Sequence, residues 1–160
     1  MHTPVVIVRA RALAFAIAAI AGMAYVAAIA EPIRPVTFVP AATVEAAFVK
    51  GVPLVETDLY KIHASRREAP GMAEVHVKDT DIIYVLEGTA TIVTGGTVVD
   101  GKTTAPGELR GAAIHGGSEQ QLARGDVFIV PNNVPHWFTK VSNPFLYYVV
   151  KATDTGAGAR

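Results

Sequence analysis

Short apolar runs separated by turn residues dominate the chain after residue 51. These runs are rich in Val, Ile, Tyr and Phe and are bounded by Gly, Pro, Asn or Asp, a pattern typical of β-strands joined by tight turns. The predicted strands are 52–64, 72–77, 81–87, 89–94, 97–99, 120–123, 127–130, 137–141 and 145–151. Many short strands with frequent turn signals predict an all-β protein, an antiparallel jelly roll or small barrel.

The polar stretches between these runs predict turns and loops. Gly95-Gly96 predicts a tight hairpin between strands 89–94 and 97–99. Residues 65–71 predict a solvated loop. Residues 100–117, which are polar and contain Pro106, predict a long loop with at most a short strand near 112–114.

The N-terminal residues have the pattern of a targeting segment. Arg9 and Arg11 precede an apolar run, 13–30, that ends in the small-x-small sequence Ala28-Ile29-Ala30. This predicts a signal peptide over 1–30 that is cleaved before Glu31, and hence a periplasmic or secreted protein. The alternative is a membrane anchor formed by residues 13–30, since the run is near the lower length limit of a span.

The segment between the apolar run and the first strand divides into two parts. Three prolines in residues 31–40 predict an extended arm, because proline fixes φ and removes a hydrogen-bond donor. Residues 41–50 have helical apolar spacing and are followed by Gly51, a helix stop. The predicted organisation is therefore 1–30 targeting segment, 31–51 arm and helix, 52–151 barrel and 152–160 flexible tail.

Composition excludes several classes of function. The 160 residues carry 14 basic and 14 acidic side chains, so the chain has no electrostatic footprint for nucleic acid. There is no Cys, which excludes disulfides, thiolate nucleophiles and thiolate metal sites. The length suits one folded domain.

Several strands are apolar on both faces. If Ile83 and Val85 face the barrel interior, then Tyr84 and Leu86 face outward. The same duality recurs in 127–130 and 145–150. Three such strands left bare would form a larger apolar patch than soluble monomers usually tolerate. We therefore expect a homodimer through an outer sheet face, with the arm 31–40 exchanged between the subunits. The alternative is a monomer whose own arm and helix cover the sheet.

Four side chains stand out as candidate metal ligands. Glu74 and His76 are two residues apart, so on a strand they point to the same side. A polar turn brings Asp81 back at the start of the next strand, and His136 follows a Pro-rich turn later in the chain. Two imidazoles and two carboxylates suit Fe(II), Mn(II), Ni(II) or Zn(II). The alternative for each is an ordinary polar strand residue, and for Asp81 a turn cap.

The stretch around Glu74 resembles the first motif of the cupin family. Glu74-x-His76, then four residues and Asp81, then six residues and Gly88, match its spacing. Two ligand positions differ, since Glu74 stands where the family has its first His and Asp81 where it has Glu. Glu68 occupies the position of the leading Gly.

The stretch around His136 resembles the second cupin motif. Gly125, Pro131 and His136 keep its spacing. Asn133 replaces a Gly, a mild change because Asn tolerates left-handed backbone, and Lys140 replaces the final Asn. The resemblance covers residues 71–140. In an alternative alignment to the first motif, His76 and Lys78 would occupy its two His positions. The charge of Lys78 would then oppose metal binding.

The resemblance to cupins implies a jelly-roll barrel with one metal site bound by Glu74, His76, Asp81 and His136. It also implies a range of activities, from dioxygenation and isomerisation to plain ligand binding, among which fold does not choose. One hypothesis is a metal-dependent enzyme of dioxygenase or isomerase type on a small organic molecule, with Glu74 or Asp81 as base. The other is a non-catalytic binding or sensing barrel, which the departures at Glu74 and Lys140 favour.

Overall fold

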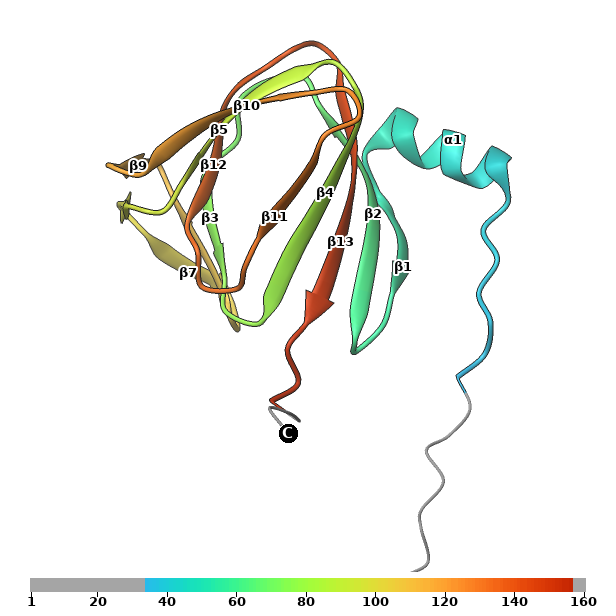
Figure 1. Ribbon diagram of the computed structural model, residues 1–160. Coiled ribbons are helices and arrows are strands. Elements are labelled where there is room, and N and C mark those ends of the chain that lie inside the picture. The colour runs from blue at the N-terminus through green and yellow to red at the C-terminus, as the bar shows by residue number, and fades with distance from the viewer. Residues whose placement is uncertain (1–33, 157–160) are drawn as a thin grey trace, which may run out of the picture. The chain divides into compact units, whose positions relative to one another are not determined.

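Two antiparallel sheets form the framework of the computed structural model, which describes residues 34–156 (Figure 1). The first sheet has the strand order β1-β2-β13-β4-β11, and the second has the order β10-β5-β12-β3-β8-β7; β6 pairs with β9 alone. The predicted all-β architecture is confirmed. The elements are α1 (Ala41–Lys50), β1 (Pro53–Glu56), β2 (Tyr60–Arg67), β3 (Ala73–His76), β4 (Asp79–Glu87), β5 (Thr89–Thr94), β6 (Thr97–Val99), β7 (Lys102–Ala105), β8 (Glu108–Gly111), β9 (Ala113–His115), β10 (Ser118–Ala123), β11 (Val127–Val130), β12 (His136–Val141) and β13 (Phe145–Thr153).

The hydrophobic core lies between the two sheets. Ile83 and Val85 from β4 are fully buried there with Ile92, Phe138 and Phe145. Tyr84, which alternates with the first two, is 44% exposed, as the strand pattern predicted. The inner faces of the sheets therefore meet, and the outer face of the first sheet carries the second set of apolar side chains.

The helix α1 begins and ends at the predicted residues. Gly51 ends it in the left-handed conformation, with φ of 66°, and its N–H bonds to the carbonyl of Ala47. Ala47 is buried, and Phe48 packs edge-on against Tyr148 of β13 at a ring-centroid distance of 4.9 Å. The helix therefore covers part of the outer face of the first sheet.

The predicted strand 52–64 is wrong, because the chain turns at Thr57. The Thr57 hydroxyl donates to the carbonyl of Tyr60 at 2.8 Å and accepts its N–H at 3.0 Å, which closes a hairpin between β1 and β2. The loop predicted over 65–71 is shorter, since β2 continues to Arg67. The extension of β2 brings Arg66 and Arg67 onto the first sheet.

The long loop predicted over 100–117 is wrong for its first part, because that part contains β7 and β8, with Pro106-Gly107 as the turn of their hairpin. The short strand expected near 112–114 is present as β9. The hairpin predicted at Gly95-Gly96 does not form either. Both edges of β5 are occupied by β10 and β12, so Thr97–Val99 pairs with β9 instead.

Two positions that match the cupin motifs have a positive φ. Asn133 has φ of 62°, which confirms the expectation that Asn adopts the left-handed turn there. Gly88 has φ of 81°, and a Cβ at this position would lie 2.7 Å from the carbonyl oxygen of Pro144. Gly88 therefore allows the end of β4 to approach the turn before β13.

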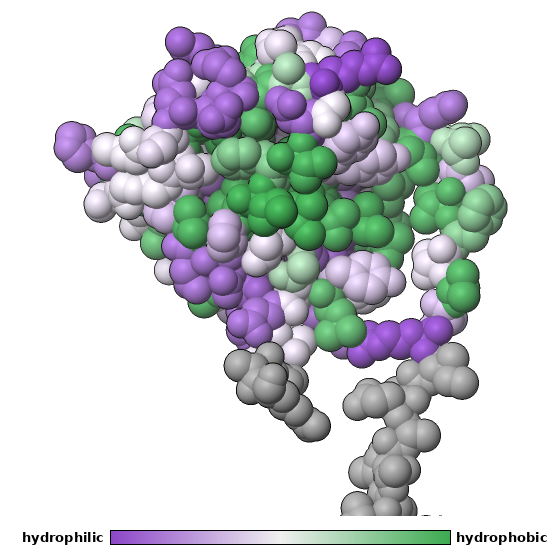
Figure 2. Space-filling model, in the orientation of Figure 1, coloured by the Kyte–Doolittle hydropathy of each residue, from purple (hydrophilic) through white to green (hydrophobic). Residues whose placement is uncertain are grey.

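An apolar patch remains on the outer face of the first sheet beside the helix. It consists of Tyr84, Val127 and Ile129, of which Val127 and Ile129 are 62% and 57% exposed. Figure 2 shows apolar side chains gathered over the region where Figure 1 places β4 and β11. Because β11 is an edge strand, the patch adjoins unpaired backbone groups.

Among residues 34–156, no helix is long and apolar enough to cross a membrane. The predicted targeting segment 1–30 lies outside the described residues, as do residues 31–33 of the arm and 157–160 of the tail.

Candidate metal centre

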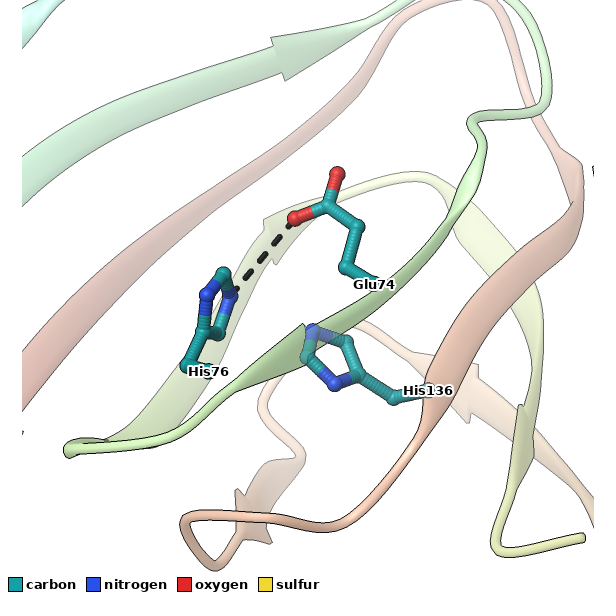
Figure 3. A group of neighbouring side chains, drawn as sticks. All are labelled: Glu74, His76 and His136. Carbon is teal, nitrogen blue, oxygen red and sulfur yellow. Dashed lines mark ion pairs between the residues drawn. The ribbon is translucent and has the colours of Figure 1, made fainter. Parts of the chain in front are cut away.

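Three of the predicted ligands come together from two neighbouring strands of the second sheet. Glu74 and His76 lie on β3, and His136 lies directly opposite Glu74 at the start of β12. One ligand atom of each side chain lies within 4.8 Å of those of the other two. Figure 3 shows the three side chains pointing toward one another. The period of two along β3 is the local reason that Glu74 and His76 share a side.

The fourth predicted ligand reaches the same point from the opposite sheet. Asp81 is on β4, and its Oδ2 lies 3.5 Å from His76 Nε2 and 3.7 Å from His136 Nε2. Glu74 Oε2 is 3.6 Å from His76 Nε2. Metal–ligand bonds of about 2.1 Å place two ligands of a tetrahedral ion about 3.4 Å apart, so these three distances are close to those around one ion. The group in which every ligand atom lies within 4.8 Å of the others is Glu74, His76 and His136.

Each imidazole is oriented through its other ring nitrogen. His76 Nδ1 lies 2.6 Å from Glu108 Oε2, and His136 Nδ1 lies 3.2 Å from the carbonyl oxygen of Val134. Both partners are acceptors, so both rings carry their proton on Nδ1 and turn Nε2 toward the centre. This is how histidine ligands of metals are usually held.

Each carboxylate is likewise held through its outer oxygen. Lys151 Nζ lies 2.7 Å from Asp81 Oδ1. Glu74 Oε1 faces two guanidinium groups, with Arg110 Nη1 at 3.4 Å and Arg67 Nη2 at 3.8 Å. The four candidate ligands therefore present one inner atom each and fix the other atom outside the centre.

The inner atom of His76 provides the test of whether a metal fits. Among the described residues, His76 Nε2 is the buried side-chain nitrogen or oxygen without a hydrogen-bond partner. A buried polar atom without a partner is costly, and a metal ion at this point would satisfy it. The residues present thus fit a divalent transition metal.

The pKa values of the buried groups at the centre are shifted by burial and by neighbouring charges. Burial would raise the pKa of Asp81, but His76 and Lys151 outweigh it and lower that pKa to about 2. Burial would lower the pKa of His76, but the carboxylates of Asp81 and Glu108 outweigh it and raise that pKa above its usual value. Burial dominates for His136 and lowers its pKa. Asp81 is therefore held as a carboxylate, and the two imidazoles differ in their affinity for a proton.

The centre opens into a cavity of about 520 Å³. Its wall is mostly polar and draws on both sheets, including Lys61, His63 and Ser65 from β2 and Arg110 from β8. This volume and this open mouth suit a small organic ligand next to the centre.

The sequence did not reveal the residues that hold the ligands. Glu108 and Arg110 lie in the stretch predicted as a loop, and Arg67 and Lys151 carried no motif. The available signal was the dipeptide Pro106-Gly107, which marks a turn. A hairpin there would have placed Glu108 and Arg110 on one side of a strand.

The other histidines and the alternative register are placed as follows. Lys78 is exposed and is absent from the cavity wall, which argues against the register that makes it a ligand. His63 lines the cavity and also pairs with Glu56, with 3.3 Å between its Nε2 and Oε1. His115 is exposed at the end of β9.

Comparison with known proteins decides the family. The family model described as Cupin matches residues 29–158. The chain belongs to the cupin family. Members of this family typically bind a metal, and the cupin has a Glu, His, His group in one place. No curated protein matches the sequence.

Solved structures similar to this cupin share its fold at low sequence identity. BH2720 from Bacillus halodurans is 13% identical with a TM-score of 0.53, covering 76% of this chain and 84% of its own. KdgF from Halomonas sp. is 16% identical with a TM-score of 0.46, covering 65% and 79%. The DMSP lyase DddQ from Ruegeria pomeroyi is 17% identical with a TM-score of 0.43, and the match covers 64% of this chain and 42% of DddQ. At these identities the likeness shows the fold alone.

The contact between Glu108 and His76 generates the first prediction. Glu108→Ala should weaken metal affinity by about 10- to 100-fold, because the imidazole loses the acceptor that orients it. Glu108→Gln, which keeps a hydrogen-bond acceptor but not the charge, should weaken metal affinity less than Glu108→Ala. Affinity is measured by competition with a chromophoric chelator on metal-free protein.

Glu119→Gln is the control for this prediction, since Glu119 is exposed on β10 and outside the cavity wall. Unchanged affinity in both Glu108 variants would show that this carboxylate does not position His76.

Proposed function

We propose that this cupin is a metal-dependent enzyme that acts on a small polar organic molecule in the cavity beside Glu74, His76, Asp81 and His136. The observation that carries the proposal is the buried Nε2 of His76, which lacks a hydrogen-bond partner and lies 3.6 Å from Glu74 Oε2 and 3.5 Å from Asp81 Oδ2. A divalent transition metal bound there would supply Lewis-acid or oxygen chemistry. Its identity among Fe, Mn, Ni and Zn is a matter for elemental analysis.

The polar cavity favours the isomerase type over the dioxygenase type. Few apolar side chains line it, among them Ile83, Phe138 and Val149. Hydroxyl and carbonyl groups of a substrate would find donors and acceptors on all sides, as proton-transfer chemistry needs. Glu74 and Asp81 each have an oxygen held by cations, so His63 is the better candidate for a proton-transfer group outside the ligand set.

A non-catalytic binding barrel is the second candidate function. It is favoured by the ion pairs at Glu74 and Asp81, which leave neither carboxylate free to act as a base. A turnover screen on the metal-loaded protein separates the two candidates. A barrel that holds metal and ligand but converts nothing is a binding module.

The second prediction concerns the ligands themselves. His76→Ala and His136→Ala should each reduce bound metal more than any loss of an outer partner, because each removes an inner atom of the centre. Elemental analysis of purified protein measures the stoichiometry, and circular dichroism checks that the β-fold is retained.

His115→Ala is the matched control, because His115 is an exposed histidine outside the cavity wall. Wild-type levels of metal in both cavity variants would rule out this centre, and metal-free wild-type protein would favour the binding barrel.

We also propose that the protein is a homodimer through the patch Tyr84, Val127 and Ile129. The helix covers the neighbouring part of the same face at Phe48 and Tyr148, so the patch lies where intramolecular covering ends. A second copy fits it because β11 is an edge strand that can align with its own symmetry mate, and burial yields about 25 cal/mol per Å² of apolar surface. The arm offers further apolar surface, with Phe38 83% exposed.

The third prediction follows from this patch. Protein beginning at Glu31 should have a dimer mass in light scattering across a dilution series, and Ile129→Lys should shift it to monomer because a charge cannot be buried there. Leu59→Lys, an exposed position in the β1–β2 turn, should leave the dimer unchanged. A monomer mass at high micromolar concentration, without aggregation, would mean that the second copy is not the cover.

Export is the last part of the proposal, and it is supported by the sequence of residues 1–30. The fourth prediction is that mature protein from the native host begins at Glu31, because Ala28-Ile29-Ala30 fits a cleavage site. Intact-mass measurement decides it. A mass that retains residues 1–30, found in the membrane fraction, would indicate the anchor.

A further inference from the structure

The cavity contains two guanidinium groups beside the centre. Arg67 comes from β2 in the first sheet, and Arg110 comes from β8 in the second. Both line the cavity, and both point to the same carboxylate oxygen of Glu74. We propose that Arg67 and Arg110 bind the carboxylate group of a small organic anion, which is the substrate or ligand of this centre. This inference rests on the proposed function for the role of the metal.

Arg67 is held rigidly in the cavity wall. Its Nε donates a hydrogen bond of 2.9 Å to the Tyr147 hydroxyl, and its guanidinium lies 4.8 Å from the centre of the Phe138 ring. Gly71 makes room for it, since a Cβ there would collide with Nη1. A guanidinium fixed by an aromatic face and a hydrogen bond loses little entropy when it binds an anion.

The terminal nitrogens of both arginines retain capacity for a ligand. Arg67 Nη2 is 3.8 Å from Glu74 Oε1, and Arg110 Nη1 is 3.4 Å from it, both longer than an ordinary charge-assisted hydrogen bond. The arginines therefore neutralise Glu74 at a distance without saturating their donors. Arg110 is partly open to solvent, so an anion that enters from the mouth can reach it.

The charge of the cavity points the same way. Five carboxylates and five Lys or Arg side chains line it: Glu56, Glu74, Asp79, Asp81 and Glu108, against Lys61, Arg66, Arg67, Arg110 and Lys151. These charges balance, so a divalent ion leaves an excess of two positive charges. Arg66 also pairs with Glu68, which lies outside the cavity wall, and this pair cancels one of the two positive charges. An excess of one positive charge remains. An anionic ligand restores neutrality in a partly buried site, where uncompensated charge is costly.

A carboxylate fits the geometry of a guanidinium group. Guanidinium presents two parallel N–H groups that match its two oxygens. Both arginines lie beside Glu74, so a carboxylate bound to them would place the adjoining carbon atoms of the ligand next to the metal ligands. The volume of about 520 Å³ accommodates a small organic acid.

The experiment compares matched anions and neutral molecules on metal-loaded protein. Malonate, succinate and benzoate are titrated by calorimetry against malonamide, succinamide and benzamide. At least one carboxylate should bind ten-fold or more tightly than its amide. Carboxylates that bind no better than their amides would overturn the proposal.

Variants assign the binding to the arginines. Arg110→Gln and Arg67→Lys should each weaken the carboxylate ten-fold or more, while Arg124→Gln, an exposed arginine outside the cavity wall, should not. Arg110→Gln keeps the test decisive if Arg67→Lys disturbs the packing on Phe138. Carboxylate affinity that survives both changes would mean that the acid binds the metal directly, which also overturns the proposal.

Metal content of each protein separates this inference from the proposed function. A wild type that holds metal but ignores carboxylates would refute the anion site and leave the metal centre standing. A wild type without metal, whose carboxylate binding still depends on Arg110, would refute the metal-dependent function and leave the anion site standing.

Discussion

Strand register is the constraint on which the centre depends. On the second sheet, Glu74 lies directly across from Arg110, and His76 lies across from Glu108. On the first sheet, Asp81 lies across from Lys151. Every one of these cross-strand pairs is also a charged contact at the centre. A slip of one residue would turn these side chains to the other face, so the fold and the site require the same alignment.

The same strands change character along their length. On the inner face of β4, Asp79 and Asp81 are followed by Ile83 and Val85, and on β12 His136 is followed by Phe138. One end of the space between the sheets is therefore polar and open, and the other is closed by packed apolar side chains. The packed end supplies the rigidity that ligands converging from different strands need. Removing one of the cationic side chains at the polar end would leave a buried carboxylate without a counter-charge. The loss of folding stability would then exceed the stabilisation that the ion pair itself contributes.

The sequence predicted what depends on local spacing. The two-residue period of β3 is enough to put Glu74 and His76 on one side of the strand. The short connection to β4 keeps Asp81 close in the chain, but Asp81 meets them only because the two sheets face each other. Glu108 and Lys151 reach the centre through pairing over 32 and 70 residues, which no local pattern encodes. The strand β7 was missed for a related reason. All four of its residues are exposed, so it lacks the alternation of apolar and polar side chains that marks a half-buried strand.

The departure of Glu74 from the cupin motif is matched by its surroundings. An imidazole at this position would be neutral, and Arg67 and Arg110 would then face a metal cation with no carboxylate between them. Glu74 instead places a negative charge beside the two arginines. The glutamate and the two arginines therefore form one unit, in which the ligand change is tied to the positive charge beside it.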